Sequence, residues 1–538
     1  CRLQYRKRIR ESERQQTLSY TNDLHDALLS KRGPTPWKCW RSKLESSTNT
    51  CKQVDGCLDV NIIAEKFAVY FSNLYTCSNV VRAAELELEY TDRKNNYCGS
   101  PFTNDYLFDT ELVSLIISKL KAGKAVGLDS LSAEHVIHSH PILPCILCRL
   151  FNLMLLSGHV PPAFGTSYTV PIPKSNNARG KEMLVDDFRG IAISPIISLL
   201  FESCILDRFK VFLSSDDNQY GFKNSVGCTH AIYAVRQTVD RFITNGSTMN
   251  LCSLDLSKAF DKVNHHALFI KLMNRCIPIN LLRLLESWYS NCQTCIKWNS
   301  VISRFFNIRF GVRQGSVLSP TLFAVYINDI VSRLPFSVNS FIVLYADDIL
   351  LMAPSVTELQ RMLTLCETEL TWLDMTINVK KSSCIRIGPR YSARCVCLKT
   401  ASGITLPWVF EVRYLGTFII SSRLFKCSLS HAKRAFYCAA NSIFGKIGRL
   451  ASEEVILQLI QSKCIPVLIY GLEVFAINSS DLKSLDFTVN RFFMKLFRTS
   501  NINIITDCQL MFNFVLPSAQ IAIRTHKFLA NLSCVDLS

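Results

Sequence analysis

The chain has 538 residues, which is too long for one compact hydrophobic core, so we expect two to four domains. Its composition, with 48% hydrophobic and 19% charged residues, excludes a mainly disordered chain and the small disulfide-stapled, collagenous and coiled-coil classes. The 60 Lys and Arg residues outnumber the 43 Asp and Glu residues and give a net charge of +17. A polyanion is therefore the first partner to consider, with nucleic acid ahead of an anionic membrane.

The 23 Cys residues are scattered and follow no secretory signal, so we expect reduced thiols in an intracellular protein. Cys145 and Cys148 have the spacing of a zinc pair, but no second pair follows, and buried thiols are favoured over zinc. We expect no membrane helix, because the best apolar candidate, residues 191–206, is interrupted by Pro195 and Glu202. The sequence begins with Cys instead of Met, which predicts a piece of something longer.

Three regions follow one another along the chain. Residues 1–105 are expected to form an N-terminal extension, with a basic helix-like stretch before Gly33 and a polar turn region before Pro101. For the basic stretch, a solvated helix and an arm on a nucleic-acid backbone both remain open. Residues 106–425 alternate apolar helix-period segments with strand-like runs, and residues 426–538 are mostly helical and basic.

The strongest local signal is a pair of adjacent acids between two apolar runs. Residues 341–345 and 349–353 flank Ala346, Asp347 and Asp348. Short apolar strands joined by a tight polar turn predict a β-hairpin that presents both carboxylates at its tip. Adjacent acids in so apolar a segment are costly unless a cation neutralises them. Mg²⁺ prefers such oxygen ligands, and a pair of these ions is suited to phosphoryl transfer.

A further carboxylate is expected from a neighbouring strand. Residues 249–256 read as an apolar strand, with Asp255 near its end. An isolated Asp at a strand end is usually a helix cap, but the second acidic strand favours a shared metal site. Asp261, at the helix start that follows, is expected to pair with Lys258 or to cap the helix instead of binding metal.

Between these strands lies a glycine-containing segment with a helix start signal. Ser319 followed by Pro320 predicts a helix over residues 321–334, with Ser319 as its N-cap. Gly311 and Gly315, just before this helix, would let the backbone approach a bulky planar ligand such as a base pair.

The order of three segments resembles motifs A, B and C of reverse transcriptases, specifically those of LINE-type non-LTR retrotransposons. These segments are Leu-Asp-Leu-Ser-Lys-Ala-Phe-Asp at residues 254–261, Arg-Gln-Gly-Ser-Val-Leu-Ser-Pro at 313–320 and Tyr-Ala-Asp-Asp at 345–348. Further blocks match in the expected order, at residues 123–129, 170–174, 187–191, 219–222, 378–382 and 414–416. The resemblance implies an α+β right-hand polymerase, with fingers and an antiparallel palm sheet over residues 106–425 and a helical thumb from residue 426.

The resemblance also implies a two-metal site. Asp255, Asp347 and Asp348 would be the acidic triad and, with the backbone carbonyl of Leu256, would bind two Mg²⁺ ions, for which Mn²⁺ can substitute. Lys381 would donate a proton to the departing pyrophosphate, although a solvated surface lysine remains equally open. The implied reaction is RNA-directed DNA polymerisation.

A nucleotide site is implied beside the metals. Lys174 and Arg189 would hold the triphosphate of the incoming dNTP, because a point charge and a planar fork neutralise it from two sides. Phe260 would lie under the sugar and exclude a 2′-hydroxyl group. Gln314 and Gly315 would pack against the template and the nascent base pair.

By the same resemblance, residues Tyr414, Leu415 and Gly416 would form the primer grip, and the partners would be an RNA template and a DNA primer. Lys223 and Cys228 depart from the residues common in the family, which concerns template contacts and not the metal chemistry. The region ahead of the polymerase is too short for an endonuclease domain, so we expect a chain that polymerises but does not cut. The family likeness implies the nucleus as its location, and the sequence predicts no oligomeric state.

Two alternatives stay open at this point. One is another enzyme on a similar palm, such as a group II intron maturase or a nucleotidyl cyclase. A cyclase would have no use for Gln314 and Gly315, and a maturase should carry its own splicing domain. The other is a decayed or repurposed copy that only binds nucleic acid, against which the intact acids at 255, 347 and 348 argue.

Overall fold

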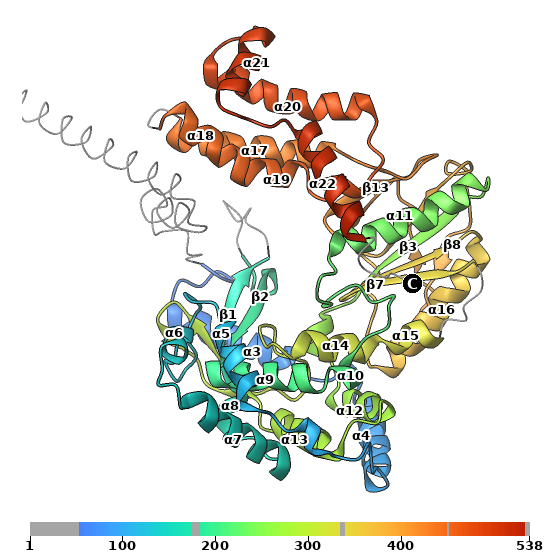
Figure 1. Ribbon diagram of the computed structural model, residues 1–538. Helices are drawn as coiled ribbons and strands as arrows, with labels where there is room; N and C mark the ends of the chain where they lie inside the picture. Colours follow the sequence, from blue (N-terminus) through green and yellow to red (C-terminus); the bar gives the residue numbers. More distant parts are fainter. Residues whose placement is uncertain (1–52, 175–182, 334–338, 449–450, 533–538) are drawn as a thin grey trace, which may run out of the picture.

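The computed structural model describes residues 53–174, 183–333, 339–448 and 451–532. In this part of the chain, helices and strands form a mixed α+β architecture (Figure 1). The basic stretch predicted before Gly33 lies outside the described residues. The longer helices are α3 (Val60–Leu74), α4 (Val80–Asn95), α5 (Thr110–Ser118), α7 (Leu143–Ser157), α9 (Ile196–Arg208), α11 (Cys228–Thr244), α12 (His265–Asn274), α13 (Ile279–Ser290), α14 (Ser319–Ile327), α16 (Val356–Trp372), α17 (Ser430–Ile447), α20 (Ser479–Phe497), α21 (Ile502–Met511) and α22 (Pro517–Leu532).

A four-stranded antiparallel sheet carries the acidic segments. Its order is β7-β8-β3-β9, with β3 (Met249–Asp255), β7 (Phe341–Tyr345), β8 (Asp348–Ala353) and β9 (Ser383–Ile387). β7 and β8 pair directly across a two-residue turn, so the hairpin predicted from the sequence is confirmed. The strands lack polar alternation because both faces of this sheet are buried.

Helices cover both faces of this sheet. One face, with Cys252, Leu254 and Leu351, shares a hydrophobic core with α12, α14 and α16. The opposite face, with Leu251 and Leu350, shares a second core with α11 and with the C-terminal helices from α17 onward. Figure 1 shows α11 on one side of β3 and β8, and α14 and α16 on the other. Each fully buried Leu contributes about 1.5–3 kcal/mol, so packing fixes the sheet from both sides.

A second sheet has the order β2-β1-β4-β5, and β6 also pairs with β4. Its strands are β1 (Thr166–Pro173), β2 (Phe188–Ile193), β4 (Gln293–Trp298), β5 (Val301–Ile302) and β6 (Phe306–Asn307). Helix α3 packs on it through Phe67, whose ring centroid lies 5.0 Å from that of Phe188 and 5.1 Å from that of Trp298. Residues of α3 and α4 therefore share one core with the region that follows, and the boundary predicted at residue 105 stays a prediction.

The C-terminal part begins with a small antiparallel sheet and continues as helices. The sheet consists of β12 (Glu411–Tyr414), β13 (Thr417–Ile420) and β14 (Lys426–Cys427). Helices α17, α20, α21 and α22 follow, in agreement with the helical region predicted after residue 425. Their apolar faces belong to the same core as α11, and Figure 1 shows α22 beside α11 and α20 and α21 farther from the four-stranded sheet.

The helix predicted over residues 321–334 with Ser319 as its N-cap is wrong in two respects. α14 begins at Ser319 itself and ends seven residues early, and a separate short helix, α15 (Asp329–Arg333), follows. The capping position is Leu318, whose side chain cannot accept a hydrogen bond. The hydroxyl of Ser316 accepts from the N–H of Ser319, and Glu202 of α9 accepts from the N–H groups of Val317 and Leu318, just before the helix. The contact with Glu202 comes from another helix and leaves no signal in the local sequence.

The described cysteines are free thiols. Cys148 is buried and donates its thiol hydrogen to the carbonyl oxygen of Phe108 at 3.2 Å, whereas Cys145 is exposed. Among the described residues, no helix combines the length and the hydropathy that crossing a membrane requires.

A buried cluster of ion pairs joins α12, α15 and α16. The ammonium group of Lys271 lies 2.6 Å from Glu369 Oε1 and 2.7 Å from Asp329 Oδ2. Glu369 Oε2 lies 2.8 Å from Arg333 Nε. The side chains of Lys271 and Glu369 are only 3% and 1% exposed, so each charge depends on its partners and not on water.

We expect Glu369→Gln to lower the free energy of unfolding by about 3 kcal/mol, because Lys271 would stay buried with one partner fewer. Urea unfolding monitored by circular dichroism measures this change. As a control, Arg361→Gln breaks the exposed pair with Glu358 and should cost less than about 1 kcal/mol. Equal losses in the two variants would contradict the role given to the buried cluster.

Candidate active site

Three carboxylates meet at the tip of the β7–β8 hairpin. In the pairing of β3 with β8, Asp255 lies directly opposite Asp348. Directly opposed residues of antiparallel strands have Cα atoms about 4.5–5.5 Å apart and side chains on the same face. Asp347 precedes Asp348 in the turn. The structure thus brings the three predicted acids together, although 92 positions separate Asp255 and Asp347 in the sequence.

The carboxylates repel one another in a partly desolvated place. Burial, and then the charges of Asp347 and Asp255, raise the pKa of Asp348 to about 6. Burial and the charge of Asp255 also raise the pKa of Asp347, while the charges of Arg189 and Lys381 oppose this shift. Carboxylates that raise the pKa of their neighbours are incompletely neutralised by the protein, which is what a site for an added cation requires.

The residues fit hard cations by their chemistry, since carboxylate oxygens are the ligands that Mg²⁺ prefers. Within the described ranges, however, no cluster of three or more His, Cys, Asp or Glu side chains is arranged to hold a metal ion. The two-metal site with Asp255, Asp347 and Asp348 therefore stays a prediction. Leu256, the predicted backbone ligand, is buried and forms an isolated bridge with Ile377.

The turn of the hairpin is held by a neighbouring segment that the sequence reasoning did not assign a role. Ala346 adopts a left-handed conformation with φ of 54°, which is uncommon for a residue with a Cβ atom. Its N–H donates to Oε1 of Gln219 at 3.2 Å, and the N–H of Gly221 donates to the same oxygen at 2.8 Å. Gln219 is fully buried, so this amide fixes the backbone just before Asp347.

Asp255 is held by the segment that resembles motif D. Asn378 donates from its side-chain amide to Asp255 Oδ2 at 3.1 Å, and its backbone N–H donates to the Asp255 carbonyl at 2.7 Å. The N–H of Asp255 donates to the hydroxyl of Ser382 at 3.1 Å. Lys381 Nζ lies 3.3 Å from Asp255 Oδ2 with 69% of its side chain exposed, so it is both solvated and close to the acids.

Phe260 lies on a short 3-10 helix, η3 (Ala259–Lys262), that follows β3. Its ring stacks on Phe323 of α14, with centroids 4.4 Å apart and planes at 18°. The ring of Phe222 meets it edge-on at 6.0 Å. These two contacts fix the half-buried ring of Phe260 in the segment that follows Asp255 of β3.

The prediction that Asp261 pairs with Lys258 is wrong. Lys258 lies 3.4 Å from Asp186 Oδ1, and Asp261 accepts a hydrogen bond of 3.0 Å from the side-chain amide of Gln314. Burial raises the pKa of Asp261 to about 6, although the charges of Lys258 and Lys174 act in the opposite direction. The i,i+3 spacing suggested a local pair, but the tertiary fold supplies a more distant partner for each residue.

The glycines before α14 serve backbone packing within the protein. Gly315 has φ of +135°, and a Cβ atom there would lie 2.2 Å from the carbonyl oxygen of Ala192. The N–H of Ala192 donates to the carbonyl of Gln314 at 2.8 Å. A Cβ atom on Gly311 would lie 2.7 Å from the carbonyl oxygen of Asp261. The backbone that these two glycines approach closely is therefore that of β2 and η3 in the same chain. The predicted approach to a base pair stays a prediction.

The two predicted phosphate-binding residues lie on the β1–β2 hairpin. Arg189 is exposed on β2. Its charge opposes the rise in the pKa of Asp347, so it acts on the carboxylates. Lys174 follows β1, donates to the backbone carbonyl of Asp186 and lies 3.9 Å from its carboxylate. Asp186 also accepts a hydrogen bond of 2.5 Å from the hydroxyl of Tyr70 of α3. Asp186 thus contacts Lys174, Lys258 and Tyr70, and the sequence analysis did not predict this role.

The predicted primer grip is the turn between β12 and β13. Leu415 and Gly416 have φ of 45° and 84°, as in a two-residue hairpin turn. The hydroxyl of Tyr470 donates to the Leu415 carbonyl at 3.2 Å. Tyr414 is buried, and burial followed by the charge of Asp348 raises the pKa of its phenol. The charge of Arg413, an exposed residue of β12 that the sequence analysis missed, opposes the rise in the pKa of Asp348.

Comparisons with known proteins agree with this arrangement. Residues 172–419 match the family model described as reverse transcriptase (RNA-dependent DNA polymerase). The chain is 27% identical over 389 residues to the RNA-directed DNA polymerase from mobile element jockey of Drosophila funebris, which covers 68% of this chain and 41% of that protein. It is 24% identical over 297 residues to the Retrovirus-related Pol polyprotein from type-2 retrotransposable element R2DM of Drosophila melanogaster, covering 53% of this chain and 28% of that protein.

A third relative is the probable RNA-directed DNA polymerase from transposon BS of Drosophila melanogaster, at 22% identity over 419 residues. The match covers 73% of this chain and 44% of that protein, so the chain spans less than half the length of these relatives. The matched residues contain the four-stranded sheet, the acidic hairpin and Asp255. Residues 172–419 therefore match the reverse transcriptase family, and the three relatives come from a mobile element, a retrotransposable element and a transposon.

Proposed function

We propose that this protein is an RNA-directed DNA polymerase that extends a DNA primer on an RNA template with dNTPs. The observation that carries the proposal is the register of β3 and β8, which sets Asp255 opposite Asp348 beside Asp347 within a reverse transcriptase domain. In this proposal, residues 106–425 supply the fingers and palm, and residues 426–538 supply the thumb. Residues 1–105 form an N-terminal extension.

The acids would hold the catalytic metals. Asp255 and Asp347, with Asp348 and the carbonyl of Leu256, would bind two Mg²⁺ ions, which Mn²⁺ can replace. When bound, the ions would activate the 3′-hydroxyl of the primer and stabilise the leaving pyrophosphate. The raised pKa values of Asp347 and Asp348 support this assignment, because the protein leaves their charges incompletely neutralised.

The basic and aromatic residues around the acids would bind and orient the nucleotide. Arg189, whose charge reaches Asp347, and Lys174 would bind the triphosphate from the β1–β2 hairpin. The ring of Phe260, fixed by its two aromatic neighbours, would lie under the sugar and exclude a 2′-hydroxyl group. Gln314 would pack against the base pair, and Lys381 Nζ would hold a proton for the leaving pyrophosphate.

Nucleic acid would bind along the basic surface of the chain. The turn at Tyr414, Leu415 and Gly416 would position the primer end, and this is supported by the effect of the Asp348 charge on the pKa of the Tyr414 phenol. The net charge of +17 predicts binding through backbone phosphates that weakens steeply with salt. Copying of element RNA at a nick in chromosomal DNA would place this activity in the nucleus.

Asp347→Asn should reduce dNTP incorporation on a primed RNA template by about 10³-fold or more, because a cation ligand is lost. Chelation of divalent cations should reduce the wild-type rate in the same way. Primer extension in Mg²⁺ measures both effects, and filter binding shows whether the primer and template still bind.

The matched control is Asp217→Asn, because Asp217 is 96% exposed and lies at a surface ion pair with Lys223. This variant should keep the wild-type rate. If the wild-type protein and Asp347→Asn incorporate dNTPs equally, or if neither does, the polymerase proposal fails and a nucleic-acid-binding protein that has lost catalysis is favoured.

Phe260→Val should raise the incorporation of rNTPs relative to dNTPs by about tenfold or more, because a smaller side chain leaves space for the 2′-hydroxyl group. Competition between the two nucleotides in single-turnover extension measures the ratio. Phe222→Leu removes the ring that meets Phe260 edge-on but leaves Phe260 itself, so its preference should stay with dNTPs. An unchanged ratio in Phe260→Val would contradict the position given to this ring.

A further inference from the structure

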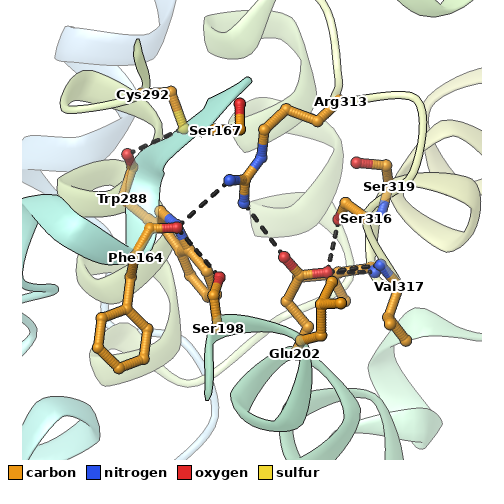
Figure 2. A network of polar contacts seen from close by, with 12 residues as sticks. Phe164, Ser167, Ser198, Glu202, Trp288, Cys292, Arg313, Ser316, Val317 and Ser319 are labelled. Atoms are coloured by element: carbon orange, nitrogen blue, oxygen red, sulfur yellow. Dashed lines mark hydrogen bonds and ion pairs between the residues drawn. The ribbon is translucent and has the colours of Figure 1, made fainter. Parts of the chain in front are cut away.

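A buried glutamate from outside the sequence motifs holds the loop before α14. Figure 2 shows the Glu202 carboxylate of α9 surrounded by Arg313, Ser316 and Val317 of this loop. Oε2 of Glu202 accepts from the hydroxyl of Ser316 at 2.6 Å, from the N–H of Val317 at 2.6 Å and from the N–H of Leu318 at 3.0 Å. The residue is 1% exposed, so water cannot replace these bonds.

The second oxygen of Glu202 binds a buried arginine. Arg313 Nη2 lies 3.1 Å from Glu202 Oε1, and Nη1 donates to the carbonyl of Phe164 at 3.3 Å. The same carbonyl accepts from the hydroxyl of Ser198 and the indole of Trp288, at 3.0 Å and 3.3 Å (Figure 2). Through Arg313, the Glu202 carboxylate is connected to the Phe164 carbonyl and to the other donors of that carbonyl, so it has little freedom to move.

Gln314 and Gly315, which lie between Arg313 and Ser316, contact other partners than Glu202. Gln314 donates its side-chain amide to Asp261 and accepts from the N–H of Ala192, and Gly315 packs on the Ala192 carbonyl. Glu202 thus fixes the loop on both sides of Gln314 and Gly315, through Arg313 and Ser316. A displacement of this loop by about 1 Å is enough to cost up to 10²-fold in rate when the loop orients a reacting group.

We propose that Glu202 is a positioning residue for the nucleotide site, and this inference rests on the polymerase function proposed above. Glu202 touches no reacting atom. Its carboxylate holds Arg313, Ser316 and the start of α14 so that the amide of Gln314 is presented at a fixed place beside Asp261. A purely structural role would affect stability alone, whereas positioning also affects the use of dNTPs.

The test compares Glu202→Gln with Glu369→Gln in the full chain. Both replace a buried carboxylate that is 1% exposed and paired with Arg or Lys, but Glu369 lies in the cluster around Lys271. In Glu202→Gln, an amide NH2 group replaces one of the two acceptor oxygens, and the neutral oxygen that remains cannot serve both Arg313 and the donors of Ser316 and the loop amides. We expect kcat/KM for dNTP to fall about tenfold in Glu202→Gln, mainly through KM, and less than about twofold in Glu369→Gln, per folded molecule.

Hydrogen exchange provides a readout that does not depend on catalysis. The amides of Val317 and Leu318 should exchange faster in Glu202→Gln than in Glu369→Gln, because a neutral oxygen is a weaker acceptor than the carboxylate that they share with Ser316. An active wild-type protein with equal dNTP kinetics in the two variants would overturn this inference alone. Unchanged exchange at the two amides would overturn it as well. A wild-type protein without activity would overturn the polymerase proposal and this inference with it.

A gentler pair of variants covers the case in which Glu202→Gln does not fold. Ser316→Ala removes a single donor to Glu202, whereas Thr488→Val removes a buried hydroxyl that donates to the Ser484 carbonyl within α20. We expect KM for dNTP to rise about threefold in Ser316→Ala and to stay at the wild-type value in Thr488→Val. Equal values of KM in the two variants would overturn the positioning role.

Discussion

The pairing of β3 with β8 is the constraint on which the site depends. This register sets Asp255 against Asp348, and a shift by one residue would turn one of the two carboxylates to the other face of the sheet. Like charges directly opposite each other destabilise a sheet, and burial, together with the charges of Asp347 and Asp255, raises the pKa of Asp348 to about 6. The strands tolerate it because hydrophobic cores on both faces of the sheet hold them in place.

The groups that moderate this repulsion come from separate parts of the fold. Arg189 approaches from β2, Lys381 from the segment before β9, and Arg413 from β12. None of these cations is buried with the acids in a closed pair, so the carboxylates keep capacity for further positive charge. A fold that neutralised the acids completely would be more stable but would leave no use for a metal ion.

Buried acids have a second use in this domain, which is to hold backbone. Glu202 and Asp261 both contact the loop that contains Gln314, and each accepts hydrogen bonds from it. Glu202 lies on α9, so it ties the loop before α14 to that helix. Separate elements therefore hold the parts of the candidate active site. α9 holds the loop, α14 holds the ring of Phe260, and the pairing of β3 with β8 holds the acids.

The sequence by itself determined the acidic hairpin, the strand that carries Asp255 and the helical C-terminal part, because each is written in a local pattern of apolar runs and polar turns. Its resemblance to reverse transcriptases was also sufficient to find the domain. The tertiary structure alone decided that Glu202 holds the loop before α14, that Asp261 pairs with Gln314 and that Gly315 packs on Ala192. These contacts join segments 53 to 123 residues apart, and spacing along the chain does not encode which distant groups will meet.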